Sequence, residues 1–435
     1  MKRKIYEKLL EWKQSKVSNP LMLLGVRQCG KTYILDKFCK NEFKSYKYVN
    51  LLEDSAIVEL YNSSLTSDEK YTRLKVLLNF DLDEEDSVLF IDEIQESEKL
   101  ISELKYFSEK HGEVKIVCAG SLLGVKLKRS HFSFPVGKVK FLHMNPMDFE
   151  EFLLALGEES LLNMIKECFS KNKQMTVSLH EKAMNLYRVY LVTGGMPASV
   201  KNMVDNENDY FNYDSTILKD IVESYFNDMD KYVTSDSEAL KIQRIYESLP
   251  TQLANTSHKF QFSKIANDAR SREYVSPLDW LEASNMVQTS FCVKTPEIPL
   301  KAFVDLDTFK LYLSDVGILN SLLGISTKDI LTDNISSYKG VIVENYVANQ
   351  LASNGNVLYY WVNSNQSEID FLIYNDDGII PVEVKASDNT QSKSLKNYMR
   401  QYHPRYALRV SSKDFGYNPE TKIKSIPLYA VFLIS

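Results

Sequence analysis

Short apolar runs alternate with helical patterns over the first third of the chain. The apolar runs are residues 21–24, 88–91 and 114–119, and the segment after the first run, residues 33–38, has the spacing of a helix. Strands and helices that alternate in this way form a parallel sheet covered by helices on both faces. We therefore predict an α/β domain whose sheet spans about residues 21–142.

Beyond this region the pattern becomes mainly helical and then mixed. Phe149, Phe152 and Leu153 recur at helical spacing within residues 147–204. We expect a further α/β region near the C-terminus. The predicted division is an N-terminal core, a helical lid or junction, a helical and winged-helix-like region and a C-terminal α/β domain, with the bounds 1–145, 146–205, 206–335 and 336–435.

Residues 262–283 predict two short helices around a turn, followed by a strand-like segment, an order typical of a winged helix-turn-helix. The second helix, residues 276–283, carries Asp279 and Glu282 but no basic side chain. Repulsion from phosphate favours a structural or protein-contact role for it. Arg270 and Arg272 in the turn leave DNA contact open as the alternative.

A glycine-rich loop lies between the first apolar run and the first helix. Its sequence, Gly-Val-Arg-Gln-Cys-Gly-Lys-Thr, has the spacing of a phosphate-binding loop in a strand–loop–helix context. Backbone N–H groups at such a helix N-terminus bind phosphate, the lysine reaches the outer phosphates and the threonine hydroxyl binds Mg²⁺. We therefore predict ATP and Mg²⁺ as cofactors. The predicted nucleotide-binding residues here are Gly25, Val26, Arg27, Gln28, Cys29, Gly30, Lys31 and Thr32.

Two acids follow the second apolar run. Asp92 is predicted to bind the same Mg²⁺ as Thr32, and Glu93 to orient or deprotonate the attacking water. The alternative is that both acids only cap a strand. Ser121, after the third apolar run, is either a sensor of the terminal phosphate or a helix N-cap.

Composition narrows the class of protein. A chain of 435 residues is longer than one hydrophobic core usually holds, which favours two or three domains. Its formal net charge of −6 provides no general attraction to nucleic acid, so such a contact needs a local basic patch. The five cysteines show no paired or metal-type spacing, which is typical of reduced thiols. We find neither a secretory pattern nor an apolar run long enough for a membrane helix, and expect a cytoplasmic protein without a membrane partner.

A second group of chemically active residues lies near the C-terminus. On a strand, alternation places Asp370 on one face with Glu368, and Glu383 on one face with Lys385. An acid on one strand and an acid with a lysine on its neighbour can hold a metal ion and a water that cleaves a phosphodiester. The alternative is a surface ion pair of little energy.

Basic and aromatic residues follow this group closely. They form either a patch that tracks a nucleic-acid backbone or the edge of a tyrosine-rich core with solvated cations. The residues are Lys393, Lys396, Arg400, Arg405 and Arg409, with Tyr398, Tyr402 and Tyr406 between them.

The phosphate-binding loop, the Ile-Asp-Glu strand and residues 134–139 and 145–152 resemble the AAA-type ATPases of bacteria and archaea that are fused to a DUF4143 region. This resemblance covers nearly the whole chain. In such families an arginine often follows a small residue near the position of Gly137, and it is suspected of completing a neighbour's active site. Here the residue is Lys138, and Arg129 and Lys128 are the other candidates for this role. A lysine lacks the two-pronged contact of a guanidinium, so activation by a neighbouring copy in a homo-oligomer stays open.

The C-terminal group resembles the PD-(D/E)xK nuclease fold. The resemblance puts Asp370 and Glu383 in the metal-ligand positions, Lys385 in the position that steers water, and Glu344 in the first-helix acid position. The leading hypothesis is a Mg²⁺-dependent ATPase whose nucleotide cycle controls a nuclease-like domain that binds or cleaves DNA or RNA. The competing hypothesis is a slow nucleotide-dependent switch whose C-terminal domain binds without cleaving.

Overall fold

The computed structural model divides the chain into two compact units. The N-terminal unit comprises Lys2–Asn145 with Ala283–Asn285, and the C-terminal unit comprises Pro146–Glu282 and Met286–Ser435 with Met1. The structure describes residues 1–15, 19–120, 122–129, 137–210, 212–231, 233, 235–255, 259–266, 270–335, 338–363, 367–386 and 393–435, with the backbone alone at residues 128 and 129.

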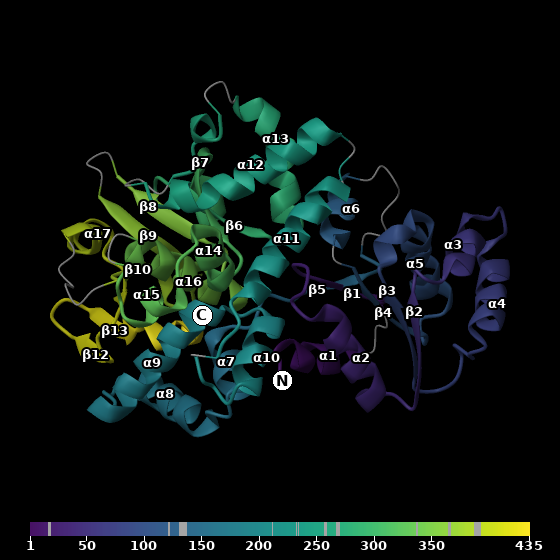
Figure 1. Ribbon diagram of the computed structural model, residues 1–435, viewed down its shortest axis with the longest axis horizontal. Coiled ribbons are helices and arrows are strands. Elements are labelled where there is room, and N and C mark those ends of the chain that lie inside the picture. Colours follow the sequence, from purple (N-terminus) through teal and green to yellow (C-terminus); the bar gives the residue numbers. More distant parts are fainter. Residues whose placement is uncertain are drawn as a thin grey trace. The chain divides into compact units, whose positions relative to one another are not determined.

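The N-terminal unit is built on a five-stranded, wholly parallel sheet (Figure 1). Its strand order is β2-β3-β4-β1-β5, so β1 lies next to the edge strand β5, with β4, β3 and β2 on its other side. This is the P-loop NTPase fold that the alternating pattern predicts. The strands are β1 (Leu21–Leu24), β2 (Ser45–Asn50), β3 (Ser87–Asp92), β4 (Lys115–Ala119) and β5 (Lys140–His143).

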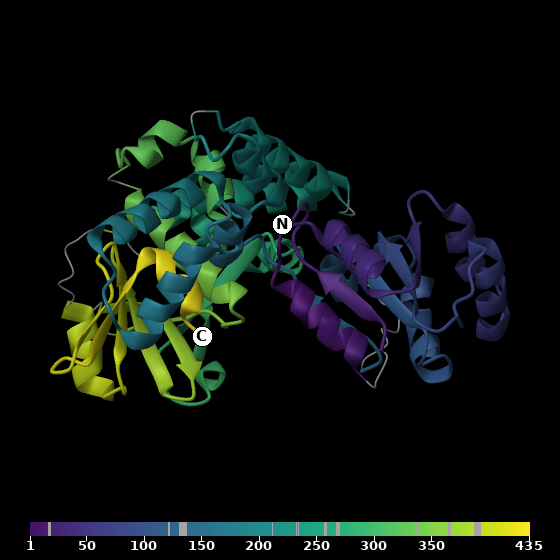
Figure 2. The ribbon, with the colours of Figure 1, turned by 90° about the horizontal axis from the view of Figure 1, so that it is seen from below.

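Helices cover this sheet because its inner strands are apolar on both faces. All residues of β1 and β3 are buried, as expected for a parallel sheet between helix layers. One core contains Met22, Ile91 and Leu104 of α5, whereas α1 and α2 meet through Trp12 and Phe38 and lie side by side in Figure 2. The helices are α1 (Ile5–Gln14), α2 (Lys31–Glu42), α3 (Ser55–Asn62), α4 (Ser67–Leu78), η1 (Ile94–Glu96), α5 (Glu98–Lys110) and α6 (Leu123–Arg129).

The C-terminal unit begins with helices. The predicted helical stretch after residue 147 is confirmed, and its Gly-Gly-Met-Pro turn lies between α9 and α10. These helices are α7 (Phe149–Ala155), α8 (Glu159–Lys171), α9 (Val177–Thr193), α10 (Pro197–Asp205), α11 (Thr216–Lys231), α12 (Asp236–Leu253), η2 (Phe262–Lys264) and α13 (Ser271–Ala283).

Helix α13 differs from its prediction. The expected second helix starts at residue 276, but α13 already begins at Ser271 and continues through Pro277. Its buried residues Tyr274, Pro277, Trp280 and Leu281 form one apolar face across the proline, and packing of this face favours a helix that begins five residues before the predicted start.

A mixed sheet of eight strands forms the rest of the C-terminal unit, in the order β12-β13-β11-β10-β9-β8-β6-β7. Strands on both sides of residue 336 share this sheet, while the predicted four-part division of the chain stays a prediction. The strands are β6 (Val287–Val293), β7 (Val304–Leu313), β8 (Tyr359–Val362), β9 (Glu368–Asn375), β10 (Gly378–Val384), β11 (Ala407–Ser411), β12 (Gly416–Asn418) and β13 (Ile423–Pro427).

Helices also pack against this sheet. Leu395 and Tyr398 of α17 join a core with Trp361 and Ile369 of the strands, and α16 contacts β6, β7 and β10. These elements are η3 (Leu300–Phe303), α14 (Val316–Leu323), α15 (Thr327–Leu331), α16 (Lys339–Ser353), α17 (Lys393–Tyr402) and η4 (Leu428–Leu433). In the described part of the chain, no helix combines the length and the hydrophobicity that a membrane crossing requires.

Candidate functional site

The glycine-rich loop runs from β1 to the start of α2. Gly25 has φ 155°, and a Cβ atom there would lie 2.2 Å from the backbone oxygen of Met144. Gly30 has φ 96° and is the N-cap of α2. Both conformations favour glycine, and at Gly25 no side chain fits beside β5's end. The loop therefore has its compact turn at the N-terminus of α2, where anions bind well.

Lys31 lies on the inner side of this loop. Its Nζ donates to the carbonyl oxygens of Gly25 at 2.8 Å and Val26 at 2.9 Å, and only 6% of the residue is exposed. The ammonium is thus held within the turn whose amides are predicted to bind phosphate. Arg3, which the sequence did not single out, donates to the carbonyl oxygens of Cys29 at 2.9 Å and Asn145 at 2.6 Å and ties the loop to the end of β5.

Asp92 ends β3 beside this loop and is 5% exposed. Its carboxylate accepts hydrogen bonds from the Tyr48 hydroxyl at 3.2 Å, the Glu93 amide at 3.0 Å and the Thr32 hydroxyl. Burial raises the pKa of Asp92 and the charge of Glu93 adds to this, while the Thr32 hydrogen bond opposes it. The structure therefore brings the two predicted Mg²⁺ ligands, Thr32 and Asp92, into direct contact.

Glu93 begins a short 3-10 helix in a left-handed backbone conformation, with φ 52°. Its carboxylate accepts a hydrogen bond from Nε2 of Gln95. Gln95 is 4% exposed and packs so closely on Gly120 that a Cβ atom there would lie 2.0 Å from Oε1 of Gln95. Sequence reasoning missed Gln95 because it lies among other polar residues, Glu96 to Lys99, and no local pattern distinguishes it. Ser121 lies outside the described residues.

Lys138, the residue at the suspected arginine position, pairs with an acid of its own unit. Its Nζ lies 3.3 Å from Oε1 of Glu109 on α5. The side chains of Lys128 and Arg129 lie outside the described residues.

In the C-terminal unit, a lysine that sequence reasoning missed lies beside the predicted acids. Lys310 of β7 is fully buried, and its Nζ contacts Glu344 of α16 at 2.8 Å and Glu368 of β9 at 2.6 Å. Tyr312 donates its hydroxyl to the same oxygen of Glu344 at 2.5 Å. The signal was a single lysine within the apolar end of a strand, residues 309–313.

Asp370 and Glu383 lie on the neighbouring strands β9 and β10, and Lys385 directly follows β10. The two strands are antiparallel, and Val382 pairs with Phe371. The next residues, Glu383 and Asp370, are therefore neighbours across the two strands. Asp370 accepts the Val384 amide at 2.7 Å. Lys385 lies 2.6 Å from Glu383, which is 3% exposed.

The charges of this group act on one another. Burial raises the pKa of Asp370 well above its usual value, and the carboxylates of Glu383 and Glu344 raise it further. Burial acts to lower the pKa of Lys385, but the neighbouring Glu383 outweighs it and the pKa is raised. A cation between Asp370 and Glu383 would relieve their repulsion.

The three predicted metal ligands do not fit one shared ion equally well. Glu344 is already bonded to Lys310 and Tyr312. Glu383 is paired with Lys385, but the Lys385 side chain is 30% exposed and can turn to solvent, so Asp370 and Glu383 can together provide carboxylate oxygens of the kind that Mg²⁺ prefers. The residues therefore fit a metal held by Asp370 and Glu383, without Glu344 as a third ligand.

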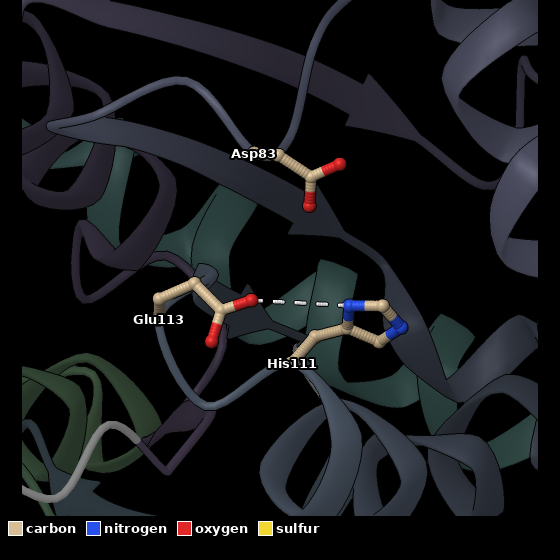
Figure 3. Close-up of side chains that lie close together, drawn as sticks. All are labelled: Asp83, His111 and Glu113. Atoms are coloured by element: carbon tan, nitrogen blue, oxygen red, sulfur yellow. Dashed lines mark ion pairs between the residues drawn. The ribbon is translucent and has the colours of Figure 1, made fainter.

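Elsewhere, among the described residues, one group of three metal-type side chains has its ligand atoms within 4.8 Å of one another: Asp83, His111 and Glu113 (Figure 3). Asp83 and Glu113 are exposed, and Asp83 is already paired with Lys75 at 2.5 Å. The ring of His111 stacks on Tyr71 at 3.8 Å. The ammonium of Lys75 already neutralises the carboxylate that a metal would need.

The basic and aromatic residues near the C-terminus have different environments. Lys393, Lys396 and Arg400 are exposed on α17, whereas Tyr398 is 1% exposed and packs edge-on against Trp361 with 5.1 Å between ring centroids. Arg405 pairs with Asp377. The cations of α17 are therefore accessible to a phosphate backbone, while Tyr398 belongs to the core.

Comparisons with known proteins agree with the geometry of the N-terminal unit. Residues 17–153 match the family model of an AAA domain, and residues 184–329 and 339–431 match models of two domains of unknown function, DUF8612 and DUF4143. A search of the curated proteins finds no match. The chain thus carries an AAA-type P-loop ATPase domain and is an ATPase.

Solved structures with partial similarity include the Walker-type ATPase PABY2304 of Pyrococcus abyssi, with 14% identity, a TM-score of 0.44 and coverage of 73% of this chain and 94% of that chain. The Aeropyrum pernix ORC2 protein has 11% identity and a TM-score of 0.35, with coverage of 76% and 93%. Similarity at this level establishes neither a shared domain arrangement nor a shared partner.

Proposed function

We propose that this chain is a Mg²⁺-dependent ATPase whose nucleotide cycle controls a C-terminal site that binds and cleaves nucleic acid. The ATPase part has its basis in the loop of residues 25–32 and its AAA-domain match. The observation that carries the nucleic-acid part is that Asp370 and Glu383 lie on two adjacent strands, with Lys385 directly after the second and 2.6 Å from Glu383.

In the ATPase site, the loop amides and Lys31 would bind the phosphates, and Lys31 would exchange its two carbonyl partners for phosphate oxygens. Thr32 and Asp92 would hold Mg²⁺, which supplies positive charge to the phosphate oxygens when bound. Glu93 would accept a proton from the attacking water, and Gln95 would hold the Glu93 carboxylate in place.

In the C-terminal site, Asp370 and Glu383 would hold a divalent ion, whose bound form supplies Lewis acidity. Lys385, 2.6 Å from Glu383, is placed to orient water or to stabilise charge on the phosphate. The exposed Lys393, Lys396 and Arg400 of α17 would contact the nucleic-acid backbone.

A second candidate is a nucleotide-dependent switch whose C-terminal domain binds nucleic acid or protein without cleavage. The observation that favours it is the bonding of Glu344 to Lys310 and Tyr312, which removes one predicted metal ligand. A fold of the nuclease type does not by itself give cleavage.

Incubation of the purified chain with Mg²⁺ and labelled single- and double-stranded DNA and RNA, with and without ATP, separates the two candidates. We expect cleavage that is lost in Asp370→Asn and that responds to ATP only while Lys31 is intact. Asp376→Asn, an exposed acid in the β9–β10 turn, is the matched control and should cleave normally. Hydrolysis of ATP without cleavage of any substrate would contradict the nuclease part and support the switch.

A further inference from the structure

Lys310 is an unusual residue because its whole side chain is buried. Its exposed fraction is 0%, and it lies between Phe309 and Leu311 in the buried end of β7. An ammonium removed from water is strongly unfavourable unless anionic groups compensate for its lost hydration. The surroundings of Nζ must therefore supply negative charge.

Three side chains surround the ammonium. Glu344 lies at 2.8 Å and Glu368 at 2.6 Å, and Nζ stands 4.9 Å from the centroid of the Tyr360 ring. Tyr312 completes the hydrogen bonds of Glu344 at 2.5 Å. Two carboxylates and an aromatic face are groups that can also hold a bound metal ion or an organic cation. Here the lysine ammonium takes that place.

The two carboxylates at Nζ favour the charged form of Lys310. Burial alone would lower the pKa of Lys310, but the carboxylates around it, that of Glu344 foremost, outweigh the burial and raise the pKa well above its usual value.

We infer that Lys310 is a built-in cation that withdraws Glu344 and Glu368 from metal binding and restricts the acidic cluster to one divalent ion, at Asp370 and Glu383. This inference rests on the proposed function of that site. The oxygens that contact Nζ at 2.6 and 2.8 Å are occupied by an ammonium that has no exposed surface and no route to solvent. Glu383 is also paired with an ammonium, that of Lys385 at 2.6 Å, but this side chain is 30% exposed and can turn to solvent when a metal ion binds. Lys310 is thus a positioning residue that sets the metal count.

Calorimetric titration with Mn²⁺ tests the inference without any activity assay. All variants carry Thr32→Ala and are measured without nucleotide, so that the ATPase site contributes no metal binding. We expect one bound Mn²⁺ per chain, lost in Asp370→Asn with Glu383→Gln, and retained in Glu344→Gln. Loss of Mn²⁺ in Glu344→Gln would overturn the inference.

Replacement of the lysine gives the converse test. In Lys310→Met, Glu344 and Glu368 lose their counter-charge, and we expect a second bound Mn²⁺ together with a rise of the melting temperature on Mn²⁺ addition that exceeds that of the parent. The combined Lys310→Met and Glu344→Gln variant removes both charges, so that Glu344 does not stay buried as an unpaired carboxylate that could prevent folding. It should bind one Mn²⁺. If the parent binds one Mn²⁺, a folded Lys310→Met variant that still binds only one would contradict the inference.

The outcomes also separate this inference from the proposed function. No Mn²⁺ bound by the parent, with one gained in Lys310→Met, would contradict the proposed metal site and support the role of Lys310. Two Mn²⁺ bound by the parent, with nucleic acid cleaved, would support the proposed function and contradict the role of Lys310.

Discussion

We expect Lys31 and Glu93 to have separable roles, because Lys31 lies in the proposed phosphate-binding loop and Glu93 directly follows β3. Lys31→Ala removes the ammonium held within the loop. A charge-assisted hydrogen bond contributes about 1.5–3 kcal/mol, so we expect ATP affinity to fall about tenfold or more. Glu93→Gln keeps the shape and should bind ATP normally but turn it over about 100-fold more slowly or worse.

Isothermal titration with ATP and a steady-state phosphate-release assay measure these two effects. Equal turnover of the parent and Glu93→Gln would remove Glu93 from the proposed role of base.

Gln95 offers a test of how Glu93 is positioned. Its amide donates to the Glu93 carboxylate from a buried place against Gly120. We expect Gln95→Ala to lower kcat roughly tenfold, the size of one lost hydrogen bond to a charged group, while KM for ATP changes little. Glu96→Ala, an exposed residue in the same 3-10 turn, is the control and should keep kcat. An unchanged kcat in Gln95→Ala would mean that Glu93 needs no such support.

At the scale of elements, Asp315 holds the turn between α9 and α10 against the start of α14. Its carboxylate accepts the amides of Gly195 at 2.6 Å and Ile318 at 3.0 Å, and it is 2% exposed. Burial raises the pKa of Asp315 to about 6, and the backbone hydrogen bonds only partly oppose this. The Gly-Gly-Met-Pro turn is therefore fixed by a buried acid.

The raised pKa predicts a pH-dependent stability. Because the folded chain binds this proton more tightly than the unfolded chain, the contribution of Asp315 is full below about pH 4 and is lost as the pH rises to about 6. The loss amounts to about 3 kcal/mol. Asp315→Asn does not titrate, so the unfolding free energy of the variant minus that of the parent should become more positive by this amount from pH 4 to pH 7. Urea unfolding of the full chain, followed through the transition of its C-terminal unit, measures this difference at each pH. A difference that does not change with pH would contradict the prediction.

Gly195 tests the packing of the same turn. A Cβ atom there would lie 1.9 Å from the backbone oxygen of Met147, whereas at Gly340, in the first turn of α16, nothing lies within 4 Å. We expect Gly195→Ala to lower the unfolding free energy by about 1–3 kcal/mol or more, as overpacking does. Gly340→Ala should be neutral or raise it by up to about 1 kcal/mol. Equal effects in thermal unfolding of the two variants would contradict the observed packing.

These elements also mark what the sequence could predict. Strand β1 and the loop to Thr32 follow from local pattern, because a glycine-rich turn between a strand and a helix is a short-range feature. Lys310 and Asp315 meet partners more than 30 and more than 100 residues away along the chain, at Glu344 and Gly195. Such contacts depend on how elements pack, which no local spacing encodes. The start of α13 was missed because tertiary packing of an apolar face outweighed the local signal of Pro277.

At the scale of the whole molecule, the central claim is that ATP in the N-terminal unit controls what the C-terminal unit does with nucleic acid. A nucleotide can shift such an equilibrium only through different affinities for two states of the protein. Exposed cations on α17 predict binding that weakens as salt increases. Lys396→Glu should therefore weaken binding more at low salt than at high salt.

The most direct test of this claim is the fluorescence anisotropy of labelled DNA and RNA titrated with the chain in ATP and in ADP. Glu93→Gln keeps ATP unhydrolysed during the titration, and Lys31→Ala serves as the variant that cannot respond. We predict nucleic-acid affinities that differ between ATP and ADP in Glu93→Gln and coincide in Lys31→Ala. Identical affinities in ATP and ADP for Glu93→Gln, or no binding at any salt concentration, would contradict the account.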